Sequence, residues 1–509
     1  ETAMLRSRWL ALVILCTASL MIILDGTIVT VALPAIAADL GFTAGSLSWV
    51  MNAYLIAFGG LLLLSGRLGD LLGRKRLFLA GITVFVLASL ACGLAQGPAM
   101  LIAARFTQGA GAAMASAVTL GMIARLFTQP EMRNRAIGGF AFTGAVGASA
   151  GLVIGGLLVQ YASWHWIFFV NLPVGIATGL AGWRVLAADQ GIGLRAGADG
   201  PGAALATSGV MLGVFAIADH TDWWAGLIAL ALLAGFAARQ ARLQATGRTP
   251  LLPPRVLASR PVSGANLAQL LIIGAAMGFQ VTVTLYMQRA LGYRPAAAGL
   301  GLLPAAAVIA VVSLGLSARL TSRFGARRLL LAGLVMITAA LAALSQIPAT
   351  AHYATWLLPA MIVFGAGGGL TLPAVTALGM TDVTDADAGV ISGLFNTSQQ
   401  VGGALGLALL TSLAAWRTGS GTSAQALTSG YQLAFTAGAV LGAASIVVAA
   451  VVLRPARKAG GSRPAGRGRP ADPADPGQRG GRLPAAAPVA GHVHLVGTAD
   501  RAEDTPAVA

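Results

Sequence analysis

Residues 65–76 read SGRLGDLLGRKR, a short basic loop between two long apolar runs, and this stretch decides the fold. Its charged residues are one aspartate and four basic residues: Asp70, Arg67, Arg74, Lys75 and Arg76. Positive charges beside membrane-spanning segments resist translocation, so such a loop stays in the cytoplasm. The loop therefore fixes the direction in which the neighbouring helices cross the bilayer.

The composition of the chain is that of a membrane protein. Hydrophobic residues make up 56% of the 509 residues and charged residues only 10%, whereas soluble domains carry roughly 25% charged residues. The 67 glycines point the same way, because membrane helices pack through small residues. We therefore predict an all-α polytopic membrane protein. We assign the net charge of +16 to loops and tail, and predict no nucleic-acid partner.

Fourteen runs are apolar and long enough, at about 20 residues, to cross a bilayer. They lie near residues 9–34, 47–66, 77–97, 99–123, 136–161, 165–187, 201–219, 222–240, 262–288, 297–318, 328–347, 352–377, 388–415 and 430–454. With both termini in the cytoplasm, only Arg289, Arg294 and Arg417 lie in outer loops, and this asymmetry of positive charge supports an even number of helices. We expect Met4 to be the natural first residue and the first helix to serve as its own insertion signal.

A degenerate copy of the basic loop, ARLTSRFGARR, begins at Ala318, and its Gly325 matches Gly73. Each copy follows the second helix of a six-helix group. We therefore predict two six-helix halves related in parallel, an arrangement found in secondary transporters. The runs at 201–219 and 222–240 are then two helices inserted between the halves.

The predicted domains follow from this repeat. They are a cytoplasmic N-terminus, an N-terminal six-helix bundle, the two-helix insertion with its linkers, a C-terminal six-helix bundle and a disordered cytoplasmic tail. Their ranges, in that order, are 1–8, 9–187, 188–261, 262–455 and 456–509. The tail holds His492 and His494, but two histidines leave a zinc sphere incomplete, so no metal site is predicted.

Four other stretches carry distinctive patterns of polar and small residues. They are LDGTIVTVALPAI at 24–36, RFTQGAGAA at 105–113, SWHWIFFVNLPVG at 163–175 and GVISGLFNTSQQVGGALG at 389–406. With the basic loop, they make residues 9–455 resemble the major facilitator superfamily, and within it the fourteen-helix drug:proton antiporter branch of multidrug efflux transporters. Where that branch usually shows Asn in the first stretch, this chain has Thr30.

The resemblance implies that the basic loop belongs to a cytoplasmic gate that latches the two halves. The matching residues are Gly66, Gly69, Asp70, Gly73, Arg74, Lys75 and Arg76. A helix N-terminus favours a carboxylate, so the helix that starts near Gly389 is the expected partner of Asp70. The alternative is that the loop serves only as a topological anchor.

Asp25 lies inside the first apolar run, where an acidic side chain costs about 2.5 to 3.5 kcal/mol on insertion scales. Its family position and this cost both indicate protonation or cation recognition, and the resemblance assigns Arg105 to proton coupling. We expect Asp25 and Arg105 to meet, with Gln108 one turn further along the same helix face. The alternatives are a carboxylate paired only for structure and an arginine that reaches the membrane interface.

Glycines recur every three or four residues in the fifth run, at Gly144, Gly147, Gly151 and Gly155, with Gly156 adjacent. The resemblance implies a close-packing face that lets the halves of an antiporter close tightly. The proline usual in this motif is replaced by Leu152. Ordinary small-residue packing is the alternative.

No catalytic constellation appears in the sequence, and no GxxxxGK[ST] loop for ATP, so we predict neither an enzyme nor an ATP-driven pump. The helices of the second half contain no acidic residue, which leaves Asp25 as the sole embedded carboxylate. We predict a proton-driven exporter of hydrophobic or amphipathic drugs that works by alternating access, with the proton gradient in place of a cofactor. The tentative cavity residues are Asn52, Gln108, Gln280, Tyr286, Asn396 and Gln400.

Two other functions remain open. One is the dedicated export of a single endogenous metabolite, such as an antibiotic or siderophore, and the other is a membrane sensor or scaffold that does not transport. The expected partners are a lipophilic substrate, protons and the lipid bilayer. We expect a monomer in the bacterial cytoplasmic membrane.

Overall fold

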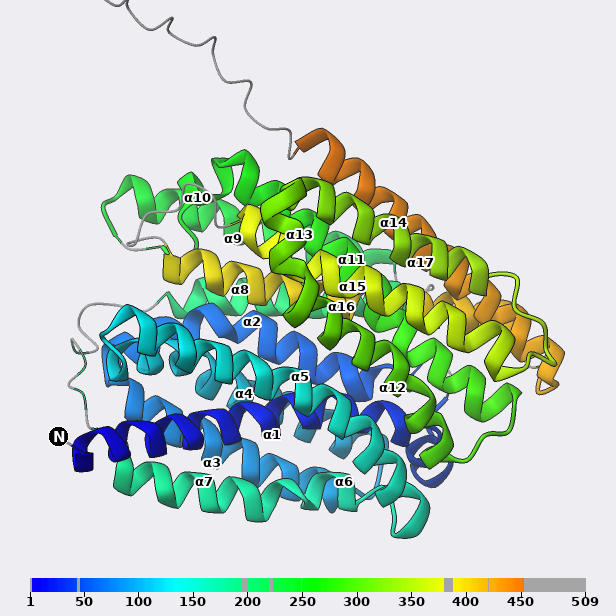
Figure 1. Cartoon of the computed structure of the whole chain (residues 1–509), viewed down its shortest axis with the longest axis horizontal. Helices are drawn as coiled ribbons and strands as arrows, with labels where there is room; N and C mark the ends of the chain where they lie inside the picture. The colour runs from blue at the N-terminus through cyan, green and yellow to red at the C-terminus, as the bar shows by residue number, and fades with distance from the viewer. Residues whose placement is uncertain are drawn as a thin grey trace, which may run out of the picture. The chain divides into compact units, whose positions relative to one another are not determined.

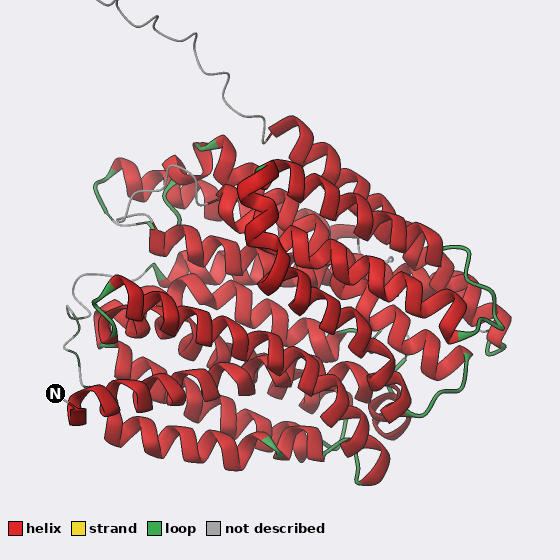
Figure 2. Ribbon diagram, viewed as in Figure 1, coloured by secondary structure: helices red, strands yellow, loops and turns green. Residues whose placement is uncertain are grey.

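The structure of the chain is a computed structural model that describes residues 2–43, 46–187, 189, 191, 193, 199–218, 223–248, 250–379, 388–419 and 421–452. All regular elements in these ranges are helices, and the described residues contain no strand (Figure 2). The chain divides into two compact units, Glu1–Pro455 and Ala456–Ala509. The second unit, which covers the predicted tail, lies outside the described residues.

The first part of the chain folds into long helices that run beside one another (Figure 1). In chain order they are α1 (Thr2–Leu40), α2 (Trp49–Leu72), α3 (Arg74–Gly93), α4 (Pro98–Leu126), α5 (Pro130–Tyr161), the short α6 (Trp166–Phe169) and α7 (Asn171–Val185). A helix bonds its own backbone groups, which is why apolar runs adopt it in a bilayer. Proline at the first positions of α4 and α5 marks where these helices begin.

Two helices follow where the insertion was predicted, α8 (Gly200–Ala218) and α9 (Trp223–Ala245). The second part then contains α10 (Pro254–Ala258), α11 (Arg260–Leu285), α12 (Pro295–Val311), α13 (Ser317–Phe324), α14 (Ala326–Leu344), α15 (Leu358–Gly379), α16 (Ala388–Thr418) and α17 (Ala424–Val452). Single π-helical turns extend α11 and α12 and precede α15, at Tyr286–Ala290, Val312–Leu316 and Tyr353–Leu357.

Twelve helices of the described residues are long and apolar enough to cross a membrane. A thirteenth is added if the pair Trp49–Leu62 and Leu64–Leu72, bent by 51°, forms one span. The run expected at 136–161 lies within α5. The described apolar segment of this helix is Ser149–Tyr161, which is shorter than the twelve spans. The structure therefore gives an all-helical membrane architecture, and the exact count of fourteen stays a prediction.

The two copies of the basic loop share one backbone turn. Gly73 links α2 to α3 with φ 95° and ψ 135°, and Gly325 links α13 to α14 with φ 84° and ψ 146°. A residue with a Cβ rarely adopts this positive φ. Glycine is thus required at both positions, where one helix ends and the next begins at once.

The copies also share a contact with a later helix. Lys75 Nζ donates to the carbonyl of Trp183, 2.8 Å away near the C-terminus of α7. Arg327 Nη2 donates to the carbonyl of Ala450, 2.9 Å away near the C-terminus of α17. Cations stabilise the negative end of a helix, so each basic loop holds the last helix of its own group.

Contacts between the two groups of helices occur mainly at two places. α2 packs against α16, and α5 packs against α12. α8 contacts both α2 and α16, so this inserted helix touches both groups. Small residues permit these approaches: a Cβ on Gly59 of α2 would lie 2.7 Å from Gln400 Cβ of α16.

Candidate functional site

A buried ion pair joins the two residues that the sequence singled out. Asp25 of α1 and Arg105 of α4 lie 2.6 Å apart, measured from Oδ2 to Nη1. Their side chains are 0% and 1% exposed. Both charges are therefore removed from water, and breaking such a pair by deleting one partner costs roughly 3–5 kcal/mol.

Polar side chains from three helices complete the surroundings of Asp25. Its Oδ1 accepts hydrogen bonds from Gln108 Nε2 at 2.8 Å and from Asn171 Nδ2 at 2.7 Å. Gln108 also donates to Ser89 Oγ at 2.7 Å and accepts from Arg105 Nη1 at 2.6 Å. The hydrogen bonds come from three different residues, so this network fixes the position of the carboxyl group. We call these five residues the carboxylate cluster.

The arginine of the cluster is held on its other side by α2. Arg105 Nε donates to the carbonyl of Val50 at 2.9 Å, and its guanidinium carbon lies 4.3 Å from the centroid of the Tyr54 ring. A desolvated cation over an aromatic face gains about 2 kcal/mol or more. Tyr54 also lines the large cavity described next, whereas Asp25 and Arg105 do not, so one aromatic ring separates the cluster from that cavity.

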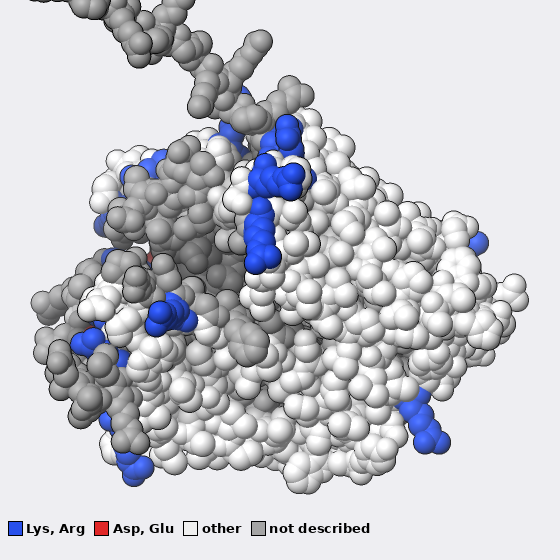
Figure 3. Space-filling model, viewed as in Figure 1, with Lys and Arg blue, Asp and Glu red and all other residues white. Residues whose placement is uncertain are grey.

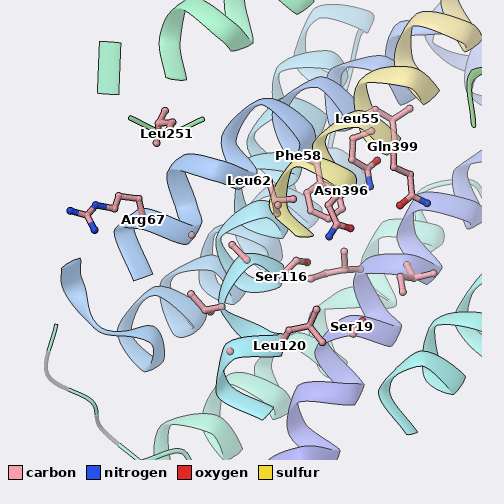
Figure 4. A pocket seen from close by; sticks show the side chains of 18 of the residues that line it. Ser19, Leu55, Phe58, Leu62, Arg67, Ser116, Leu120, Leu251, Asn396 and Gln399 are labelled. Atoms are coloured by element: carbon pink, nitrogen blue, oxygen red, sulfur yellow. The ribbon is translucent and has the colours of Figure 1, made fainter. Parts of the chain in front are cut away.

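A cavity of about 1230 Å³ lies between the two groups of helices. Its walls come from α1, α2 and α4 on one side and from α11 and α16 on the other. Figure 4 shows Phe58 and Leu62 of α2 near Asn396 and Gln399 of α16, with Ser116 of α4 on another side. Ligand sites are mostly apolar with a few polar groups, and this lining fits that composition.

Three of the six predicted cavity residues line the cavity. They are Gln280, Asn396 and Gln400, and they supply amides from α11 and α16. Helix position identified them because each is polar within an apolar run. Gln399 also lines the cavity, and its polarity within the same apolar run predicts this position.

The other three residues lie elsewhere, which corrects their predicted placement. Gln108 is fully buried in the carboxylate cluster. Tyr286 is 0% exposed and donates its hydroxyl to the carbonyl of Pro348 at 2.7 Å. Asn52 is also 0% exposed, and among the described residues neither polar atom of its side chain has a hydrogen-bond partner. Polarity within a helix thus did not specify which face points to the cavity.

The cavity opens at the end of the bundle that carries the basic loop. Gly66, Arg67, Asp70 and Arg74 all belong to its lining. At the opposite end the two groups of helices touch: Gln288 Nε2 donates to the carbonyl of Val31 at 3.1 Å.

The predicted gate residues lie around one ion pair within the loop. Arg74 Nη2 contacts Asp70 Oδ1 at 3.2 Å, and Arg74 Nη1 donates to the carbonyl of Gly121 of α4 at 3.0 Å. Gly69 packs against Val118, while Arg76 is exposed. The described partner of Asp70 is therefore an arginine of its own loop. The expected partner near Gly389, at the start of α16, lies outside the residues whose side chains are described.

A carboxylate that the sequence did not single out holds the same loop. Asp189 accepts the backbone N–H groups of Arg74 at 3.0 Å and Lys75 at 3.2 Å, so it caps the N-terminus of α3. Burial raises the pKa of Asp189. These hydrogen bonds and the charge of Arg125, 3.5 Å away, lower the pKa by more than burial raises it, so the net pKa lies below its usual value. The loop is thus tied to the linker that leads into the inserted helices.

The glycine face of α5 divides between two neighbours. A Cβ on Gly147 would lie 3.2 Å from the carbonyl of Leu20, and Gly144, Gly151 and Gly155 likewise face α1 of the same group. Only Gly156 faces the other group, where a Cβ would lie 2.7 Å from Ala296 Cα of α12. Most of this face therefore packs the first group internally, which differs from the expected closure between halves.

Comparison with known proteins places this geometry in a family context. Residues 15–407 match the sequence model described as Major Facilitator Superfamily. The puromycin resistance protein pur8 of Streptomyces alboniger is 37% identical over 459 residues, which cover 87% of this chain and 90% of that protein. The cephamycin export protein CmcT of Amycolatopsis lactamdurans is 39% identical over 459 residues, covering 87% and 91%.

Solved structures show a similar fold at low sequence identity. A bacterial homologue of the human lysosomal transporter Spinster, in an inward-facing and unoccupied conformation, superposes with a TM-score of 0.63 at 16% identity. The match covers 88% of this chain and 97% of that one.

Proposed function

Because the chain belongs to the major facilitator superfamily, we propose that it exports hydrophobic or amphipathic small molecules in exchange for protons. The mechanism is alternating access between two six-helix halves, with two further helices inserted between them. The names of its relatives support drug export, since they include proteins for puromycin resistance, cephamycin export and tetracenomycin C resistance and export. The chain acts as a transporter and not as an enzyme.

The observation that carries the proposal is the carboxylate cluster, which lies one ring away from the cavity. Protonation of Asp25 would remove its charge from Arg105 and convert two charge-assisted hydrogen bonds into weaker ones. Arg105 already stacks on Tyr54, which lines the cavity. A change in the pairing of Arg105 would therefore reach the cavity wall through this ring. Proton binding and the shape of the cavity wall are then linked through a single side chain.

The proposed cycle starts from the conformation described here, which opens at the basic loop. The positive charge of that loop supports a cytoplasmic position for this opening in a bacterial cell, and we assign both termini to the same side. Substrate enters there, protons are taken up from outside, and the contacts between α5 and α12 must part for release. A ligand shifts such an equilibrium only through its different affinity for the two states.

A second candidate is the export of one metabolite made by the same cell. The relatives named for a single antibiotic, such as the cephamycin export protein, favour it. Both candidates use the same cavity and the same proton site, and they differ only in the breadth of substrates.

Reconstitution in proteoliposomes tests the proposal, with radiolabelled puromycin and a cephamycin as probes. An imposed pH gradient should drive accumulation of at least one probe, and nigericin, which collapses the gradient, should abolish it. Accumulation that is indifferent to nigericin would reject proton coupling. A panel of unrelated amphiphiles then separates broad export from export of one compound.

A further inference from the structure

A short apolar segment forms part of the cavity wall at its open end. Pro250, Leu251 and Pro253, from the linker between α9 and α10, all belong to the lining. Figure 4 shows Leu251 toward the end of the cavity where Arg67 of the basic loop lies. Most of the basic side chains visible in Figure 3 also gather toward one end of the molecule, as expected where loops meet water. Apolar residues at this polar end therefore border the cavity and not the lipid tails.

The linker contributes to the cavity where the second copy of the basic loop does not. The first copy, residues 65–76, supplies four residues to the lining. The second copy, residues 318–328, supplies none of its described residues. The described rim of the cavity is therefore polar on the side of the first copy and apolar where the linker lies.

Gln240 of α9 fixes the linker to the start of α8. Its side chain is buried. Its Oε1 accepts the backbone N–H of Leu252 at 3.2 Å, and its Nε2 donates to Asp199 Oδ2 at 2.7 Å. Asp199, whose side chain is 3% exposed, also pairs with Arg239 at 2.6 Å and accepts the N–H of Gly202 at 2.9 Å. A buried chain of hydrogen bonds, anchored on a charged group, thus holds the linker in place.

The side chains of the linker divide between anchoring and the cavity. Leu252 and Val256 belong to the large apolar cluster of the protein, whereas Leu251 lies outside that cluster and lines the cavity. Pro250 and Pro253 flank the two leucines, and a proline ring fixes the backbone torsion φ. The hydrogen bond at Leu252 and the two prolines therefore set the direction of the Leu251 side chain.

We propose that residues 250–253 form an entry subsite for the apolar group of an amphipathic substrate, an inference that rests on the proposed use of this cavity for substrate. Leu251 contacts the apolar group, and Gln240 and Asp199 are positioning residues that hold the linker at the rim. Each methylene that leaves water on contact favours binding about fourfold. The inserted helices thus supply part of the substrate site.

Two thiol reagents that differ only in their apolar group test the subsite. N-ethylmaleimide and N-cyclohexylmaleimide react with Leu251→Cys in the purified full-length protein, in a background without Cys16 and Cys92, and mass spectrometry of the intact protein gives both rates. Each rate is divided by the rate of the same reagent with N-acetylcysteine in the same detergent solution. The resulting ratio of cyclohexyl to ethyl reagent should be about tenfold, as expected when between one and two methylenes leave water.

Thr246→Cys is the matched control on the same linker. Thr246 is exposed and lies outside the described lining, so its ratio should be close to one. Equal ratios at the two positions would overturn the subsite, because a general preference of the protein surface or the micelle for the larger reagent would then explain both.

Gln240→Leu, added to Leu251→Cys, tests the positioning role. It removes both hydrogen bonds of the amide, so the ratio should fall at least threefold toward that of Thr246→Cys. Gln432→Leu is the control, since Gln432 of α17 donates to the carbonyl of Ile347 at 2.8 Å and lies outside the described lining. It should leave the ratio unchanged. A ratio that stays at the level of Leu251→Cys in Gln240→Leu would reject Gln240 as a positioning residue.

This experiment is independent of proton coupling, since the labelling requires no gradient. A raised ratio at Leu251→Cys together with failure of gradient-driven accumulation would reject the proposed function alone. The reverse result, gradient-driven accumulation with equal ratios at Leu251→Cys and Thr246→Cys, would reject only the entry subsite.

Discussion

At the scale of single residues, the decisive feature is a carboxylate whose every close partner is a donor. The carboxylate oxygens of Asp25 accept hydrogen bonds from the side chains of Arg105, Gln108 and Asn171, all within 2.8 Å. An isolated charge is costly inside a bilayer, so a carboxyl group at this depth needs partners of this kind. We propose that protonation of Asp25 exchanges the cluster between a paired and an unpaired state, and that this exchange couples protons to transport.

Asn171→Ala should impair both stability and coupling. It removes a hydrogen bond to a charged group, which contributes about 1.5–3 kcal/mol, so the free energy of unfolding in detergent should fall by that amount. Gradient-driven accumulation should also fall severalfold, because the carboxylate is held less firmly.

Asn266→Ala is the control for this variant. Asn266 is buried in the second group, where it donates to the carbonyl of Val262 and accepts from Ser398 Oγ. These neutral bonds contribute about 0.5–1.5 kcal/mol each, so stability should fall while the ratio of gradient-driven to gradient-free transport stays unchanged. The same loss of that ratio in both variants would contradict a special role for Asn171.

The sequence predicted part of this cluster. Asp25 and Arg105 were recognisable because a charged residue inside an apolar run is costly and therefore indicates a function. Gln108 was recognisable because it lies one helical turn from Arg105. Asn171 was missed, since it lies 146 residues from Asp25 in the chain and a single amide in an apolar run does not reveal its partner. Asn171 lies within the stretch 163–175 that carries the family resemblance, but no role was predicted for it.

At the scale of elements, the helix pair α2–α3 is held from outside by a linker carboxylate. Asp189 caps α3 through the N–H groups of Arg74 and Lys75. Loss of a capping side chain costs typically about 1 kcal/mol. The linker to the inserted helices therefore stabilises the loop at the open end of the cavity.

Asp189→Ala should remove this cap. Hydrogen exchange of the Arg74 and Lys75 amides, followed by mass spectrometry, should accelerate about fivefold, as expected for a loss of about 1 kcal/mol. Asp39→Ala, the same chemical change at the far end of α1, should leave these amides unaffected. Unchanged exchange in Asp189→Ala would show that Asp189 does not cap α3.

Low pH should act on the wild-type cap in the same way. The pKa of Asp189 is lowered in the folded state, so its contribution to stability is fully present above the unfolded value of about 3.9 and is lost as the pH falls through the folded value. Between pH 5 and pH 8, corrected for intrinsic exchange, protection of the Arg74 and Lys75 amides should stay constant. A decline of protection already at pH 6 would contradict this assignment.

The helices themselves were largely predictable from apolar runs, since length and hydropathy decide which segments cross a bilayer. The turn between α2 and α3 was also predictable, because Gly73 recurs as Gly325 in the second copy. The cap by Asp189 was not predictable. The segment around Asp189 has no periodicity, and the cap depends on the tertiary fold, which brings this linker to the start of α3.

At the scale of the whole molecule, transport requires that two groups of helices part at one end and close at the other. The closed end depends on backbone proximity, as at Gly156 of α5 beside Ala296 of α12. This pairing could not be derived from the glycine pattern alone, since the other four glycines of the same face pack against α1.

Gly156→Leu should prevent closure at that end, because the nearest atoms are backbone and cannot move aside cheaply. Ser116→Cys, in a background without Cys16 and Cys92, reports the open cavity, since Ser116 belongs to its lining. Its reaction with a maleimide added from the side of the basic loop should slow severalfold in Gly156→Leu.

Gly139→Leu is the control on the same helix, since nothing described lies within 4 Å of the position of its Cβ. It should leave the labelling rate of Ser116→Cys unchanged. Equal rates for all three proteins would show that the α5–α12 contact does not govern which end is open.

Asp25→Asn separates proton coupling from transport itself, because two transport modes can be compared in this variant if Asp25 carries the coupled proton. Exchange of whichever probe the wild-type protein accumulates should persist without a gradient within a few-fold of wild type, which also shows that the variant folds. Accumulation driven by a pH gradient should fall at least tenfold, while Asp39→Asn keeps both activities. Gradient-driven accumulation at the wild-type level in Asp25→Asn would contradict the account.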